Sequence, residues 1–84
     1  MTQQENELIA RLDDNLPWRT EGEMPQAFEY VLVDTDRYGM HCDMAIGLWL
    51  GWAAVTRWVY RSEIVEVMKQ EGIAPKAYGY RGPV

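Results

Sequence analysis

Cysteine and histidine are almost missing from this chain of 84 residues, which holds one of each, Cys42 and His41. A single cysteine excludes an internal disulfide, and one cysteine with one histidine is too few for a four-ligand structural zinc site. The longest apolar run, residues 44–55, is shorter than the roughly 20 residues that a membrane-spanning helix needs. The first ten residues contain no basic segment followed by an apolar one, so we expect no signal peptide and a cytoplasmic location.

Basic residues are also scarce, and the charges are unevenly distributed. The chain has eight Lys and Arg residues against thirteen Asp and Glu, which gives a formal net charge of −5. Residues 1–43 hold ten acidic and three basic side chains, whereas residues 44–84 hold three acidic and five basic. Direct binding to nucleic acid is disfavoured, because phosphate groups need a basic stripe. The acidity is either a solvated surface or a negative face that meets a basic protein partner, such as a nucleic-acid-handling protein.

Apolar residues, in contrast, are abundant and are arranged with the periods of helices and strands. Hydrophobic residues make up 48% of the chain, enough for the core of a single domain spanning residues 1–84, in which 75–84 is expected to be a flexible or docking tail. We predict an α+β fold of order α-β-β-β-α, in which a three-stranded antiparallel sheet is flanked by an N-terminal and a C-terminal helix. The expected elements are a helix over about 3–14, a loop to residue 27, strands at 28–35, 40–49 and 55–61, and a helix that Ser62 caps and Gly72 ends.

The stretch YGMHCDM at 38–44 places histidine, cysteine and aspartate side by side, and these are ingredients of nucleophilic and metal sites. Strand alternation puts Cys42 on the apolar face with Met40 and Met44, and His41 and Asp43 on the other face. Neighbours on opposite faces cannot form a thiolate–imidazole pair, and the sequence has no second histidine. We therefore predict no catalytic residue, no cofactor and no metal site, and we interpret Cys42 as a packing residue.

Two sets of residues are candidates for binding a protein partner. Several aromatic residues lie within a twelve-residue stretch, 49–60, and exposed Trp and Arg are typical of interface hot spots. The alternative is that these rings pack the helices onto the sheet. Carboxylates in loops and turns form the second set, because loop charges are exposed by default. The candidate partner-binding residues are Glu21, Glu23, Asp34, Asp36, Trp49, Trp52, Arg57 and Trp58.

Four short segments resemble a family of small phage and prophage domains of unknown function. The family pattern is a Trp, then Leu-Pro, Tyr-Val-Leu-Val and Val-Thr-His-Trp. The matching segments cover about half of the chain, and Met24 and Arg57 stand where the family has Leu and His. The resemblance implies a mobile-element origin and no known activity. The segments are Trp18, Met24-Pro25, Tyr30-Val31-Leu32-Val33 and Val55-Thr56-Arg57-Trp58.

The function that we predict from these observations is protein binding without catalysis. By analogy, a small acidic chain of this kind suits a phage inhibitor that covers a surface of a host protein, as anti-defence proteins of the anti-CRISPR type do. The alternative is an assembly accessory that forms a homodimer through its aromatic face. A small ligand-binding protein or enzyme would need a pocket that the sequence does not indicate.

Overall fold

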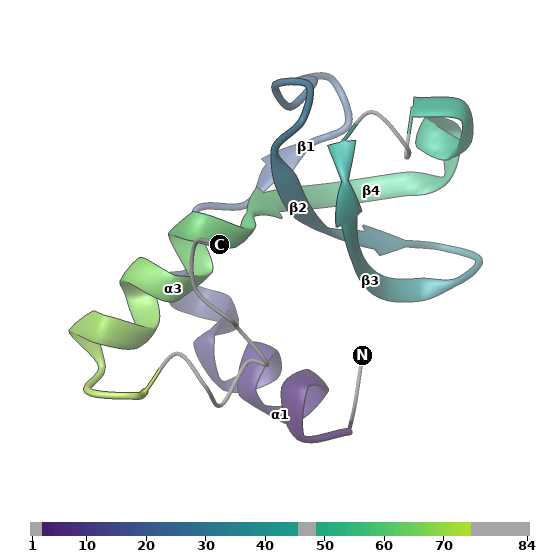
Figure 1. The fold of residues 1–84 in the computed structure, drawn as a ribbon. Helices are drawn as coiled ribbons and strands as arrows, with labels where there is room; N and C mark the ends of the chain where they lie inside the picture. The colour runs from purple at the N-terminus through teal and green to yellow at the C-terminus, as the bar shows by residue number, and fades with distance from the viewer. Residues whose placement is uncertain (1–2, 46–48, 75–84) are drawn as a thin grey trace.

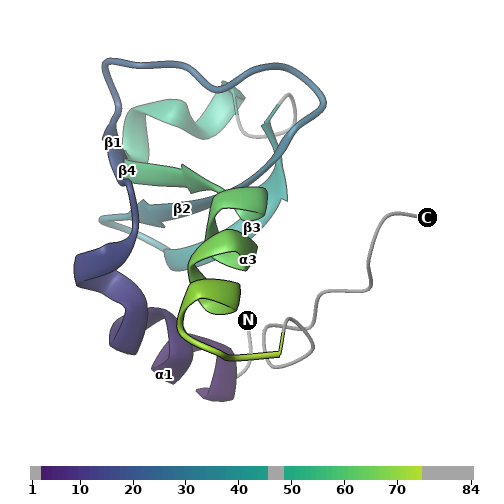
Figure 2. The same ribbon diagram turned by 90° about the vertical axis from the view of Figure 1, so that its left-hand side faces the viewer.

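The computed structural model describes residues 3–45 and 49–74 and shows an α+β fold (Figure 1). Two α-helices lie on one side of an antiparallel sheet, whose strand order in the described residues is β1-β4-β2-β3 (Figures 1 and 2). No helix within these ranges is long and apolar enough to cross a membrane. In chain order the elements are α1 (Gln3–Leu12), the 3-10 helix η1 (Asp13–Asn15), β1 (Arg19–Thr20), β2 (Tyr30–Thr35), β3 (Gly39–Met44), the 3-10 helix η2 (Trp49–Ala54), β4 (Val55–Tyr60) and α3 (Arg61–Gln70).

The sheet contains a fourth strand in the segment that the sequence analysis assigns to a loop. This strand, β1, has two residues, Arg19 and Thr20, which pair with Trp58 and Arg57 of β4. Two residues are too few to show a hydrophobic alternation, so periodicity could not reveal them. A tertiary contact helps to hold the strand, because the guanidinium of Arg19 lies 5.1 Å from the ring centroid of Trp58. The α+β class is confirmed, and the predicted three-stranded sheet is corrected to four strands.

The other element boundaries differ from the predictions by a few residues. The helix α1 ends at Leu12, and one 3-10 turn continues to Asn15. The strand β2 begins at Tyr30 instead of Phe28, because Phe28 has a φ of 67°, which extended backbone does not adopt. The strand β3 ends at Met44, whereas the prediction continued to residue 49. The predicted tail, 75–84, lies outside the described residues.

One side of the sheet packs against both helices. Leu32 of β2 and Val59 of β4 are fully buried at this contact. Met40 and Cys42 of β3 pack against the same cluster while staying half-exposed, which confirms the apolar face predicted for these two residues. The helix and loop residues buried in this cluster are Ile9, Leu12, Leu16, Ile64, Val67 and Met68.

Residues close in sequence form the turn of the β2–β3 hairpin and the caps at both ends of α3. Gly39 has the positive φ expected of a turn glycine, 71°, and so does Gly72 after α3, at 73°. Ile73 N–H donates to the Met68 carbonyl at 2.8 Å, so α3 ends in a Schellman motif at the predicted glycine. The predicted N-terminal cap is wrong: Ser62 lies inside α3, and the Glu63 carboxylate instead accepts the Tyr60 N–H at 3.1 Å.

Candidate interaction surface

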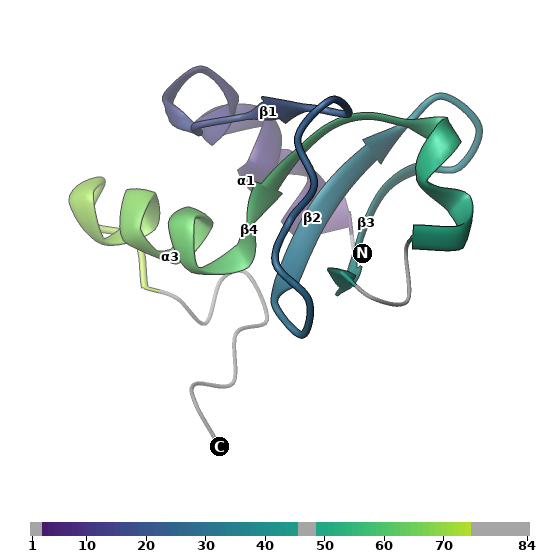
Figure 3. The same ribbon diagram turned by 90° about the horizontal axis from the view of Figure 1, so that it is seen from above.

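Residues 21–29, which we call the strap, cross the side of the sheet opposite the helices (Figure 3). The strap follows β1, passes over β4 and β2, and leads into β2. Beneath it lies a second apolar cluster, formed by Val31, Val33, Val55 and Trp58, with Trp52 and Tyr60 packed against it. Pro25 is the one buried residue of the strap, whereas Glu21, Gly22, Glu23, Met24, Gln26, Phe28 and Glu29 are exposed.

Three aromatic side chains hold the main chain of the strap and of the residue before it. Trp58 Nε1–H donates to the carbonyl oxygens of Thr20 and Glu23, at 3.1 and 2.8 Å. Trp52 Nε1–H donates to the Glu21 carbonyl at 3.0 Å. The Tyr60 hydroxyl accepts the N–H of Gln26, also at 3.0 Å. These bonds supply main-chain partners to a segment that has no strand pairing of its own.

The predicted Trp contacts therefore have an internal role where the structure describes them. Trp58 is 1% exposed, and its ring meets those of Tyr60 and Trp52 edge to face, at centroid distances of 4.9 and 6.3 Å. A side chain so fully covered cannot anchor a partner, and we place Trp58 in the core. Trp52 is half-buried, with its N–H used beneath the strap. The side chain of Trp49 lies outside the described part of the chain.

Arg57 and Asp34, two further predicted contacts, bind each other. Arg57 Nε lies 3.1 Å from Asp34 Oδ2, Nη1 lies 2.8 Å from Asp13 Oδ1, and the guanidinium lies 4.0 Å from the ring centroid of Trp18. This cluster joins η1 to β2 and β4. We interpret it as a tertiary clamp. Asp36 is exposed in the β2–β3 turn, and Glu21 and Glu23 are exposed on the strap.

His41, Cys42 and Asp43 do not form a common site. His41 lies opposite Val33 and Asp43 opposite Val31, on the strap side of the sheet, whereas Cys42 lies opposite Leu32 on the helix side. Asp43 Oδ1 accepts the N–H of Met44 at 2.7 Å. Within residues 3–45 and 49–74, no group of three or more His, Cys, Asp or Glu residues is placed to hold a metal ion.

The strap turns at Phe28 in a conformation that disfavours a side chain. Glu29 N–H donates to the Gln26 carbonyl at 3.4 Å, and Phe28, the third residue of this turn, has a φ of 67°. A left-handed backbone costs a residue with a Cβ about 1–2 kcal/mol, and glycine or asparagine normally fills the position. Burial does not offset this strain, because Phe28 is 71% exposed.

Other exposed residues surround Phe28 in the sequence. Met24 on the strap is 52% exposed, and Tyr30 at the start of β2 is 47% exposed. Residues 21–30 contain three glutamates and no lysine or arginine. We define the strap surface as Glu21, Glu23, Met24, Phe28 and Glu29. Glu21 and Glu23 were predicted contacts, whereas Met24, Phe28 and Glu29 were not. Phe28 and Glu29 begin the pattern FEYVLVDT, which reads as a strand from its first residue.

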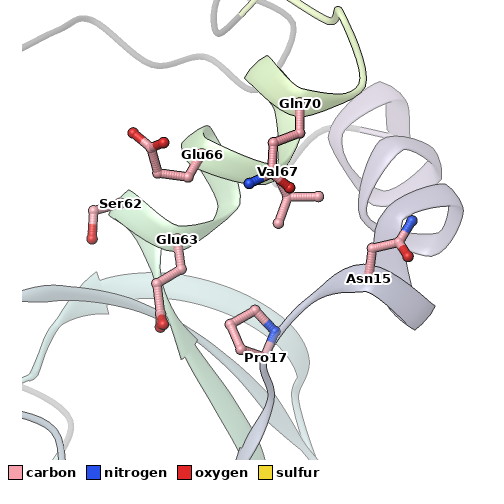
Figure 4. A pocket seen from close by; sticks show the side chains of 7 residues that line it. All are labelled: Asn15, Pro17, Ser62, Glu63, Glu66, Val67 and Gln70. Atoms are coloured by element: carbon pink, nitrogen blue, oxygen red, sulfur yellow. The ribbon is translucent and has the colours of Figure 1, made fainter.

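A groove of about 390 Å³ lies between α3 and the segment that leads from η1 to β1 (Figure 4). Both of its carboxylates face cations: Glu63 binds Arg19 through two contacts, of 2.5 and 3.0 Å, and Glu66 lies 3.7 Å from Lys69. Because Glu63 is half-buried and bound by Arg19 through both carboxylate oxygens, we do not place the candidate site in the groove. It is lined by Asn15, Pro17, Ser62, Glu63, Glu66, Val67 and Gln70.

The bonds of Glu63 predict a pH-dependent contribution to stability. Burial raises the pKa of Glu63, but hydrogen bonds from Arg19 and from the Tyr60 N–H, with the charge of Arg19, outweigh it and hold the pKa below its ordinary value. A depressed folded-state pKa stabilises the fold above the unfolded-state pKa, and this contribution is lost as the pH falls through the folded-state value. Glu63→Gln should therefore lower the free energy of unfolding at pH 7 by about 1 kcal/mol.

Urea titrations from pH 7 down to about pH 3, below the ordinary range of glutamate, test this expectation. The difference between wild type and Glu63→Gln should shrink as the pH falls. Glu66→Gln is the matched control, since this side chain is 67% exposed, and it should change stability little at any pH. A Glu63→Gln difference that stays constant with pH would contradict the ionic role.

Comparisons with known proteins found no similar protein. No family model, no curated protein and no solved structure matches the chain. The resemblance to small phage domains therefore stays a prediction that rests on the segments quoted in the sequence analysis.

Proposed function

We propose that this protein is a protein-binding module and that Phe28 is the central contact of its strap surface. Phe28 carries the proposal, because it combines a strained backbone with an aromatic ring left 71% exposed. Within the isolated chain, the ring buries little apolar surface, so its burial does not offset the free-energy cost of the strained backbone. A partner that buried the ring in a pocket would supply the missing hydrophobic free energy, and buried aromatic residues dominate the energetics of many interfaces.

The charge of the strap supports a particular kind of partner. Glu21, Glu23 and Glu29 are exposed, and no basic residue lies between residues 21 and 30. Arg19, before the strap, lies 3.9 Å from the Glu23 carboxylate and leaves this side chain 69% exposed. A complementary surface has an apolar pocket bordered by Lys or Arg side chains, as a nucleic-acid-handling protein can have. We extend the proposal to the setting expected from the sequence: a cytoplasmic, phage- or mobile-element-encoded protein that blocks such a surface on a host protein, in the manner of an anti-CRISPR inhibitor.

The alternative function, a homodimer formed through an aromatic face, is less well supported than partner binding through the strap surface. Trp58 is buried, and the Trp52 indole N–H is bound beneath the strap. Trp58 therefore offers no aromatic face to a second copy, and Trp52 is already partly buried. We therefore keep the strap surface as the proposed contact.

Capture from a bacterial lysate with matched variants tests the proposal. Wild-type protein and Phe28→Gly serve as baits, and Tyr38→Ala is the control, because Tyr38 is an aromatic residue 74% exposed in the β2–β3 turn. We expect a protein that wild type and Tyr38→Ala retain and that Phe28→Gly loses. Retention of the same proteins by all three baits would contradict a role for Phe28.

The acidic residues of the strap are tested on the captured partner by its association rate. Glu21→Lys with Glu23→Lys should slow association, and wild-type association should slow as salt rises, while dissociation changes less. Asp14→Lys with Glu66→Lys changes the net charge equally at exposed residues outside the strap, and it should have the smaller effect. Association that is equally fast in both double variants and independent of salt would show that the acidic residues of the strap interact only with solvent and do not attract the partner.

A further inference from the structure

The outer edge of β3 is the longest sheet edge in the described residues that lies against no other strand. The strand order β1-β4-β2-β3 places β3 at the end of the sheet, and β3 has six residues, whereas the opposite edge strand β1 has two. A strand edge presents main-chain N–H and C=O groups and serves as a template for pairing with another chain. We propose that β3 pairs antiparallel with β3 of a second copy of this chain.

The ladder between β2 and β3 fixes which groups of β3 point outward. Ala45 N–H donates to the Glu29 carbonyl at 2.8 Å, which makes Glu29 and Ala45 a hydrogen-bonded pair. Antiparallel pairs alternate, so His41 and Asp43 direct their main-chain groups at β2, and the even-numbered residues 40, 42 and 44 direct theirs outward. A separate contact agrees, because the outward N–H of Met44 is bound by a side chain, that of Asp43, at 2.7 Å.

The sequence of β3 is complementary to itself in one register. Two-fold pairing through the outward groups must be centred on a residue and not between two residues. Centring on 41 or 43 would place His41 opposite His41 or Asp43 opposite Asp43, whereas centring on Cys42 pairs the whole of 40–44. Met40 then lies opposite Met44 of the partner copy, and His41 lies opposite its Asp43, on both sides of the axis. A hydrogen-bond donor opposite a carboxylate, and apolar residues opposite each other, stabilise a strand pair. Asp43 would exchange its bond to Met44 N–H for the imidazole of the second copy.

Sedimentation velocity of the full chain tests both the pairing and its register. We expect wild type to pass from monomer to dimer between about 10 µM and about 1 mM, the range of weak interfaces. His41→Asp places two Asp pairs across the axis, and Asp43→His places two His pairs there. Each substitution should raise the dimer dissociation constant about tenfold. The swapped double variant, His41→Asp with Asp43→His, restores both pairs and should return the constant to near the wild-type value.

Asp36→His is the matched control, since it makes the same chemical change in the exposed turn before β3 and should leave the dissociation constant unchanged. A wild-type chain that stays monomeric over the whole range would overturn the proposal. A dimer that the swapped variant fails to restore, while circular dichroism shows all variants folded, would equally overturn it. These outcomes are independent of partner capture through Phe28, because the strap surface and the β3 edge share no residue.

Discussion

Trp58→Ala is expected to lower the free energy of unfolding by about 3–5 kcal/mol, which is a large fraction of the total stability of a domain of this size. Trp58 is 1% exposed and contacts Trp52, Tyr60 and the guanidinium of Arg19. Its indole N–H also donates to two carbonyl groups, of Thr20 and Glu23. The substitution therefore leaves a large cavity under the strap and removes the indole donor from both carbonyls. Within the described residues, only the Thr20 carbonyl keeps another donor, the Glu23 N–H. Urea unfolding followed by circular dichroism measures the loss.

Trp58→Phe separates the packing of the ring from its hydrogen bonds. Phenylalanine keeps an aromatic ring beneath the strap but has no N–H, so the fold should survive with a loss of about 1–3 kcal/mol. The amide of Glu23, which donates to the Thr20 carbonyl, should then exchange with solvent faster, while amides in α3 keep their protection. Unchanged exchange in the strap would show that the indole bonds do not hold it in place.

Arg57→Met is expected to lower the free energy of unfolding by about 2 kcal/mol, between the values for exposed and buried ion pairs. Arg57 is 32% exposed and lies against Asp13, Asp34 and the ring of Trp18. Methionine keeps much of the aliphatic stem, so the loss reports on the charge and on the cation–π contact. Thermal and urea unfolding measure it.

The control for Arg57 is Arg37→Met, because Arg37 is exposed in the β2–β3 turn. It should change stability by less than about 0.5 kcal/mol. If Arg57→Met and Arg37→Met had the same free energy of unfolding, the result would contradict a stabilising clamp between η1 and the sheet. Arg57 would then be available as the partner contact that the sequence predicted.

Elements with strong local signals were predictable from the sequence. Apolar residues at helical spacing marked α1, and the β-branched and aromatic run at 55–61 marked β4. Gly39 and Gly72 marked two chain reversals, because a positive φ favours glycine. The sequence also predicted that Cys42 packs on the apolar face of its strand, and contact with the helix-side cluster confirms this.

The strap could not be predicted, because its structure depends on contacts between distant residues. The bonds from Trp58 to Glu23 and from Gln26 to Tyr60 join residues 35 and 34 positions apart. Phe28 favours an extended backbone by its residue type, and only the turn in the folded chain holds it at positive φ. The aromatic rings were recognised as important, but periodicity could not show that they support the strap from beneath.

The most direct test of the account measures stability and binding on one variant, Phe28→Gly. Glycine adopts the φ of 67° without strain and loses little buried surface, so the free energy of unfolding should rise by about 1 kcal/mol. The same preparation should no longer capture the partner that wild type retains. Higher stability with lost capture is the result that the account predicts. Capture by Phe28→Gly equal to that of wild type would contradict it.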